Sequence, residues 1–211
     1  MSDHLQQPDH RHAVSRRLTI IEAAIAVFRS TAFHESTVEL VAEQAGLTVA
    51  DVQQHFPTWD GLVLATLDRW NDGRMRPLIP LGSSHGTVLF LRAIVRDNLA
   101  DSALMRFLVA LLAVAATPGH PLAPHLQNRY QQFHLLVRDA LAKDIDEGRE
   151  PATMEPRRGA EQLIALYEGL QLQSMVRPGL DLLEAFDRAV TRMRTAWAQP
   201  YVAPVWDVDP S

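Results

Sequence analysis

The sequence predicts an all-α protein, and three observations lead to that prediction. Apolar residues recur at spacings of three and four through most of the chain, whereas the alternation and the β-branched runs typical of strands are missing. Short stretches rich in glycine or proline, such as PGHP, EGREP and RPG, separate these periodic segments. A chain of 211 residues that is 47% hydrophobic can also bury a substantial core. We therefore expect about nine helices packed around an apolar interior.

Composition narrows the classes of function. The formal net charge is −5, so the overall charge does not indicate a nucleic-acid partner. There is no cysteine, which excludes disulfides, thiolate metal sites and cysteine nucleophiles. The N-terminal segment lacks the apolar core of a signal peptide, and the longest apolar run, FLVALLAVAA at 107–116, is too short to span a bilayer. We expect a cytoplasmic protein with no membrane segment, in which that run forms a buried helix.

The first elements are a polar tail and two amphipathic helices. Residues 1–13 are polar and are expected to form a mobile tail, whose histidines lack the fixed geometry that a metal site needs. From Arg16 the apolar spacing predicts a first helix that ends near Ser30. A second helix, TVELVAEQA, follows, and Thr37 can cap its start.

The next element is a short helix within GLTVADVQQHFP, residues 46–57. Gly46 suits the left-handed residue that closes the preceding helix, and Thr48 with Asp51 has the spacing of a capping box. Pro57 ends the helix. A helix of two turns is marginal alone, so we expect neighbours to hold it and its outer residues to meet a partner. These outer residues are Val49, Ala50, Gln53, Gln54 and His55.

Six further helices are predicted. Thr58 can cap WDGLVLATLDRWND, and the following RPLIPLGSSHG is expected to be a loop at a domain boundary. The others span 87–101, 103–117, 121–148, 156–177 and 181–198. The last two carry continuous apolar stripes, which either the same chain or a symmetry-related copy in a four-helix interface could cover.

Several motifs together indicate a family. They are IIEAA and VF in the first helix, STV at the start of the second, VAEQAGLT across the turn and HFPTWDGL leaving the short helix. The order of helix, glycine turn and short helix is also that of a helix-turn-helix, in which the short helix enters the major groove. Through these motifs, residues 16–64 resemble the DNA-binding domain of the TetR family of bacterial transcriptional regulators.

The resemblance implies an architecture and a function. A helix-turn-helix DNA-binding domain is expected at 14–58, a larger helical domain for ligand binding and dimerisation at 59–198, and a C-terminal tail at 199–211. The implied function is that of a ligand-responsive transcriptional regulator, a repressor that binds a palindromic double-stranded DNA operator as a homodimer. A small apolar or amphipathic effector in the larger domain would release it by changing the separation of the two short helices.

The resemblance and the apolar patterns together nominate three sets of residues. The DNA-binding candidates are Arg17, Thr37, Thr48, Val49, Gln53, Gln54, His55 and Trp59. The ligand-binding candidates are Trp70, Phe107, Leu111, Tyr130, His134, Tyr167 and Gln171. The dimer-interface candidates are Leu163, Leu170, Leu182, Phe186, Val190, Met193 and Trp197.

Alternatives remain open for individual residues and for the function. Trp59 can stack along the DNA backbone or pack under the fourth helix, and Asp51 can cap the short helix or accept a hydrogen bond from cytosine. Acidic residues outnumber arginines over residues 1–62, and Val49 and Trp59 stand where the family usually has lysines. These departures favour the alternative of a regulator-like ligand or protein sensor with weak or no DNA binding. No nucleophile with a base, phosphate loop or paired carboxylates is evident, so neither an enzyme nor a cofactor is expected.

Overall fold

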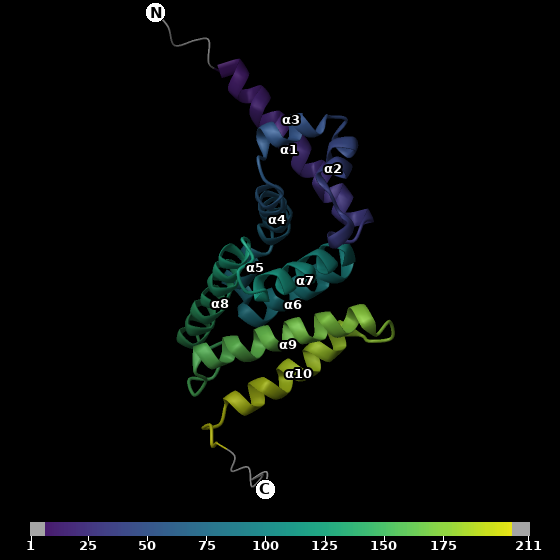
Figure 1. Ribbon diagram of the computed structural model, residues 1–211. Coiled ribbons are helices and arrows are strands. Elements are labelled where there is room, and N and C mark those ends of the chain that lie inside the picture. Colours follow the sequence, from purple (N-terminus) through teal and green to yellow (C-terminus); the bar gives the residue numbers. More distant parts are fainter. Residues whose placement is uncertain (1–6, 204–211) are drawn as a thin grey trace, which may run out of the picture. The chain divides into compact units, whose positions relative to one another are not determined.

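The computed structural model describes the backbone of residues 7–203 and the side chains of residues 13–203. Within residues 7–203 it contains ten α-helices, one short 3-10 helix and no strand, which confirms the predicted all-α class (Figure 1). The elements are α1 (Gln7–Ser30), η1 (Phe33–Glu35), α2 (Val38–Ala45), α3 (Val49–His55), α4 (Trp59–Met75), α5 (Ile79–His85), α6 (Thr87–Ala100), α7 (Ser102–Ala116), α8 (Ala123–Asp146), α9 (Pro156–Val176) and α10 (Leu182–Trp197).

The chain divides into two compact units. The first unit runs to Ile79 and resumes over Arg96–Tyr130, and the second comprises Pro80–Val95 and the chain from Gln131 onward. Helices α6 and α8 therefore each contribute one part of their length to the first unit and the other part to the second. This division does not test the predicted boundary between the DNA-binding domain and the larger domain at residues 58 and 59. That boundary stays a prediction.

Helix α1 is the centre of the first unit, where it packs against α2, α3, α4 and α7. Ile20, Val41, Val52 and Val63, one from each of α1 to α4, are completely buried. The helix begins at Gln7, although residues 1–13 were predicted to form a tail. The residues of these first turns are polar and show no apolar periodicity, so the sequence pattern could not predict that they are helical.

Helix α5 occupies the stretch predicted as a loop, and that prediction was wrong. Pro80 stands in the first turn, where a missing N–H costs no hydrogen bond. Gly82 leaves room for Phe90, because a Cβ at Gly82 would lie 3.3 Å from the Phe90 Cβ. Proline and glycine therefore act here as a helix start and a close packing contact rather than as helix breakers.

In the second unit, α9 packs against α10. Leu163 of α9 and Phe186 of α10 are fully buried. At the end of α10 the indole Nε1 of Trp197 donates to the side-chain oxygen of Gln162 at 2.6 Å, and Arg194 pairs with the buried Glu150 at 2.9 Å. Among the described residues no single helix is long and apolar enough to cross a membrane; α6 and α7 reach that length and composition only when counted together, and a break separates them.

Candidate functional site

The turn between α2 and α3 is built by side-chain and backbone caps. Thr37 Oγ1 accepts from the Leu40 N–H at 3.4 Å and so caps α2. Gly46 has φ 67°, a left-handed conformation that glycine adopts without steric cost, and the Leu47 N–H returns to the Ala42 carbonyl at 2.9 Å. The glycine turn therefore ends α2 and redirects the chain into α3, as the sequence predicts.

The start of α3 is closed by the predicted capping box. Thr48 Oγ1 accepts from the Asp51 N–H at 3.1 Å, and Asp51 Oδ2 accepts from the Thr48 N–H at 3.1 Å and from the Thr48 hydroxyl at 2.7 Å. These bonds from Thr48 lower the pKa of the Asp51 carboxyl, and attraction from Arg16 adds to the effect. Of the two alternatives for Asp51, the structure shows the cap.

The outer face of α3 is polar and accessible. Gln53 and Gln54 are exposed and Val49 and His55 are half-buried, while Val52 and Phe56 face the interior with at most 4% of their surface exposed. The amide side chains of Gln53 and Gln54 offer a donor and an acceptor each, the combination that reads adenine in the major groove. The face expected to meet a partner is therefore free to do so.

Besides the capping residues Thr37 and Thr48, two further DNA-binding candidates have contacts within the protein. Arg17 donates from Nη1 to the His55 carbonyl at 2.7 Å, and its guanidinium lies 3.9 Å from the centre of the Phe56 ring. Trp59 meets Phe28 edge to face, with 5.9 Å between ring centres. The packing alternative thus describes Trp59, and Arg17 is attached to α3 rather than directed only towards solvent.

Aromatic rings join α1, α4 and α7 in the first unit. Phe107 stacks on Phe28 with 4.5 Å between ring centres and lies 5.8 Å from Trp70. Trp70 and Phe107 were predicted to bind a ligand, and the structure shows them packed against rings of the same unit. A ligand-binding role for these two residues stays a prediction.

Asp101 ties the same three helices together. Its carboxylate accepts from Trp70 Nε1 at 2.9 Å, from Arg29 at 3.2 Å and from the Leu104 N–H at 3.1 Å. Burial raises the pKa of Asp101, but these three bonds outweigh it and hold the pKa below its ordinary value. Asp101 was not among the residues predicted from the sequence. Its position just before the apolar run of α7 indicates a helix cap. Its contacts with Trp70 and Arg29 could not be predicted, because those residues are distant in sequence.

The remaining ligand candidates fall in both units. Leu111 is buried and Tyr130 is exposed in the first unit. In the second unit Tyr167 and Gln171 are buried on α9, His134 is half-buried on α8, and the Tyr167 ring lies 6.5 Å from that of Phe133. Next to Tyr167, burial raises the pKa of Glu168 to about 7. This shift depends on the packing around α9 and could not be predicted from the sequence.

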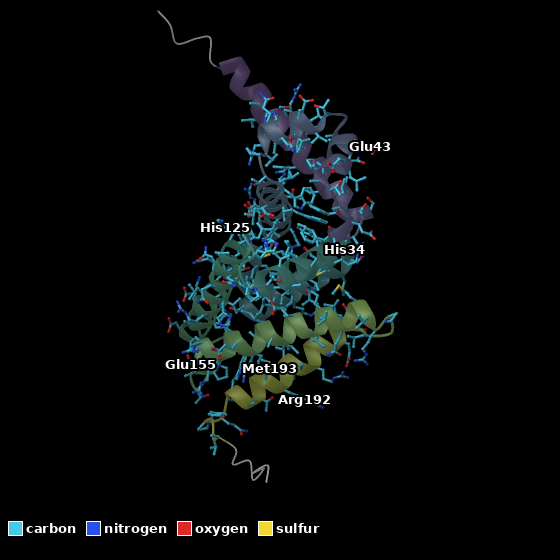
Figure 2. All side chains as sticks on the ribbon, viewed as in Figure 1. His34, Glu43, His125, Glu155, Arg192 and Met193 are labelled. Atoms are coloured by element: carbon cyan, nitrogen blue, oxygen red, sulfur yellow. The ribbon has the colours of Figure 1, made fainter. Side chains whose placement is uncertain are left out.

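Most dimer-interface candidates are already covered within one chain. Leu170 and Met193 are half-buried. Arg192, the residue before Met193 on α10, is exposed (Figure 2). The others have at most 8% of their surface exposed, and they are Leu163, Leu182, Phe186, Val190 and Trp197. These five residues agree with the alternative in which the same chain covers its apolar stripes, because α9 and α10 turn the stripes inward.

The tail histidines lie outside the residues whose side chains the structure describes, and no metal site is evident among the described ones. In the part of the chain that the structure describes, no three His, Asp or Glu side chains form a group that could hold a metal ion. His125 is exposed on α8 (Figure 2), and His120 accepts the Leu122 N–H at 3.2 Å within a turn.

Two family models match the chain. The model described as "Bacterial regulatory proteins, tetR family" matches residues 20–66, which include α2, α3 and the turn between them. The model described as "BetI-type transcriptional repressor, C-terminal" matches residues 88–197. Together they span both halves of the predicted architecture.

Individual proteins are similar as well. The HTH-type transcriptional regulator BetI of Serratia proteamaculans is 30% identical over 169 residues, which are 77% of this chain and 82% of that protein. A transcriptional regulator from Rhodococcus sp. Rha1 has the same fold, with a TM-score of 0.71 and 22% identity over 89% of this chain and 99% of its own. Thermus thermophilus FadR, in complex with lauroyl-CoA, gives a TM-score of 0.61 and 18% identity over 91% of this chain and all of its own.

The capped helix-turn-helix, the family model that spans most of the second half of the chain and the similarity to BetI agree with one another. The chain belongs to the TetR family of bacterial transcriptional regulators.

Proposed function

We propose that this regulator is a repressor that binds a palindromic DNA operator as a homodimer and is released by a small-molecule effector. The observation that carries the proposal is the outer face of α3, where exposed Gln53 and Gln54 stand on a helix closed by a capping box. Two such helices in a dimer would reach successive major grooves about 34 Å apart. DNA is the partner, so the site of action is the cytoplasm.

The DNA contacts divide into two kinds. Gln53, Gln54 and His55 face the bases, while Thr37, Thr48 and Val49 lie at the starts of α2 and α3, where the backbone of the duplex would pass. Contacts of the first kind determine sequence preference, and contacts of the second kind fix the register. Trp59 leaves this set, because its ring is packed on Phe28.

The effector is proposed to be apolar or amphipathic. The similar FadR of Thermus thermophilus was solved with lauroyl-CoA, which joins an acyl chain to a charged nucleotide. An effector can release the operator only if it binds one conformation of the dimer more tightly than the other. The candidate residues are considered in each unit by itself: Trp70, Phe107, Leu111 and Tyr130 in the first, and His134, Tyr167 and Gln171 in the second.

The dimer face is proposed to lie on the outer side of α9. Ala165, Gly169, Leu172 and Val176 follow one another at spacings of four, three and four and are all exposed, Leu172 to 51% and Val176 to 72%. A Cβ at Gly169 would meet nothing within 4 Å in the single chain, so a second helix could approach closely there.

Sedimentation of wild type and of Leu172→Glu tests this face. The substitution places a charge in the proposed interface and should shift the dimer towards monomer without unfolding it. Leu136→Glu is a matched control, because Leu136 on α8 is exposed to the same 51%. Equal effects of the two substitutions, or none from Leu172→Glu, contradict the proposed face.

A selection from random DNA duplexes tests the function. The wild-type protein should enrich a palindrome, and an added effector should release it. The alternative is a sensor that does not bind DNA, which the acidic residues 1–62 and the internal contacts of Arg17 favour. Recovery of no preferred sequence at moderate salt would support the sensor and contradict the repressor.

A further inference from the structure

We propose that Arg17 is a positioning residue that holds the C-terminal end of α3 and thereby sets the base-reading face, and that it is not a phosphate contact. This inference rests on the proposed function. It assigns a specificity-determining role to a side chain on α1 that contacts the C-terminal end of α3. Three observations carry it.

The first observation is the hydrogen bonding at the end of α3. The last regular bond of this end runs from the Phe56 N–H to the Val52 carbonyl at 2.9 Å. The next residue, Pro57, has no N–H, so it cannot continue the ladder to Gln53. The Arg17 guanidinium supplies a charged donor at this point, to the His55 carbonyl at 2.7 Å.

The second observation is the stacking of the same guanidinium on Phe56. The distance of 3.9 Å to the ring centre is within the range of a cation–π contact. Phe56 is 4% exposed and anchors α3 in the core of the first unit. Arg17 therefore attaches both the backbone and the anchoring ring at the end of α3 to α1.

The third observation is the small size of α3. It has seven residues, and Val52 is its one fully covered side chain among them. A helix this short is not stable by its own hydrogen bonds, so its direction depends on what holds its two ends. Thr48 and Asp51 hold the start, and Arg17 holds the finish, where a cation also interacts favourably with the helix dipole.

The neighbouring Arg16 provides a matched control. It lies on the same helix, is exposed like Arg17 and carries the same charge. Within the described residues it attracts Asp51 electrostatically but makes no hydrogen bond to α3. Arg16→Gln and Arg17→Gln therefore remove the same charge from the same surface, and only the second removes a contact with the end of α3.

The experiment compares wild type, Arg17→Gln, Arg17→Lys and Arg16→Gln on the duplex that the wild type selects and on a random duplex, at several salt concentrations. Arg17→Gln should lower the ratio of specific to random affinity by about tenfold, the worth of one hydrogen bond to a charged group. The salt dependence of binding should be the same for Arg17→Gln and Arg16→Gln. The ratio of specific to random affinity of Arg16→Gln should equal that of wild type. Arg17→Lys keeps the charge and one donor but not the planar stack, so its ratio should be intermediate.

Amide hydrogen exchange on the free proteins gives a readout without DNA. The Phe56 amide should exchange about tenfold faster in Arg17→Gln, because the end of α3 opens more often, and should not change in Arg16→Gln. Thermal melts should show that all variants fold, since Arg17 is exposed.

Two results would overturn the inference. One is an equal loss of affinity for both duplexes in Arg17→Gln with a salt slope smaller by about one, restored by Arg17→Lys, which is the behaviour of a phosphate contact. The other is unchanged exchange at Phe56. Failure of the wild type to enrich any sequence would instead defeat the proposed function and the base-reading role together, while the exchange result would still decide whether Arg17 holds the helix.

Discussion

Helices α3 and α10 are held in place by different forces. α3 has seven residues and buries Val52, and hydrogen bonds from Thr48, Asp51 and Arg17 close its two ends. α10 has 16 residues and buries a stripe that includes Leu182, Phe186 and Val190. Where caps position a helix, its outer face is free to carry recognition. Where burial positions a helix, most of its apolar side chains serve stability, and substitutions there should affect the whole fold.

The largest effect should come from the buried stripe. Phe186→Ala removes a ring with no exposed surface and should lower the free energy of unfolding by about 3 to 5 kcal/mol, since the cavity cannot collapse completely. Leu136→Ala, at a side chain that is 51% exposed, is the control and should change it by less than about 0.5 kcal/mol. Urea denaturation measures both. A loss below about 1 kcal/mol for Phe186→Ala would break the comparison, because α10 would then not depend on burial.

Next in size is the effect of Glu168 on α9. Burial raises its pKa from 4.5 to about 7, so the folded state keeps a proton that the unfolded state releases. Stability should therefore fall as the pH rises from 4.5 to 7 and stay low above that range. Glu168→Gln should remove this decline and gain about 1 kcal/mol at pH 8, a figure reduced for the partial exposure of the group. Melting temperatures from pH 4.5 to 8 test the sign, and an identical pH profile for the variant would contradict it.

The two helices also differ in how much of them the sequence could predict. The capping residues of α3 are neighbours in sequence, so Gly46, Thr48 and Asp51 were assigned from their spacing and the structure agrees. The helices after α4 were predicted from periodicity, except α5, whose glycine and proline resembled a loop. Periodicity shows that a stripe is apolar but not what covers it. Phe186 was therefore placed in a dimer interface, although the chain itself buries the ring.

Contacts between distant positions were the least predictable part of the site. Arg17 reaches a carbonyl 38 residues away, and Asp101 accepts from Trp70, which is 31 residues away. Both arginine and tryptophan side chains suited several roles until their neighbours were known. Arg17 was named as a DNA-binding candidate and Trp70 as a ligand-binding candidate without these contacts, because sequence alone shows the chemistry of a side chain but not its direction.

A smaller effect should come from the cap of α3. Thr48→Ala removes the acceptor for the Asp51 N–H and should cost about 1 kcal/mol of stability. Thr58→Ala is a matched cap variant, because Thr58 accepts the Gly61 N–H at 3.1 Å at the start of α4. Both should melt at similar temperatures, but only Thr48→Ala should weaken the preference for the selected duplex. Equal effects on DNA binding would show that the α3 cap has no special part in recognition.

The smallest effect on stability should accompany the largest effect on recognition. Gln53 and Gln54 are exposed and contribute nothing to the buried face of α3, so the double substitution to alanine should change the free energy of unfolding by less than about 0.5 kcal/mol. The same change removes the groups that can pair with base edges, so the preference for the selected duplex should disappear while weak binding to any duplex remains. Gln131 and Gln132 form a second exposed pair on α8, and their double substitution should alter neither property. Denaturation and a repeated selection on random duplexes measure both quantities.

If the Gln53 and Gln54 variant keeps the wild-type preference, α3 is not the reading element, and the freedom of its outer face has another purpose. If the preference is lost together with stability, the outer face is not independent of the fold, and the contrast between a capped helix and a buried one fails.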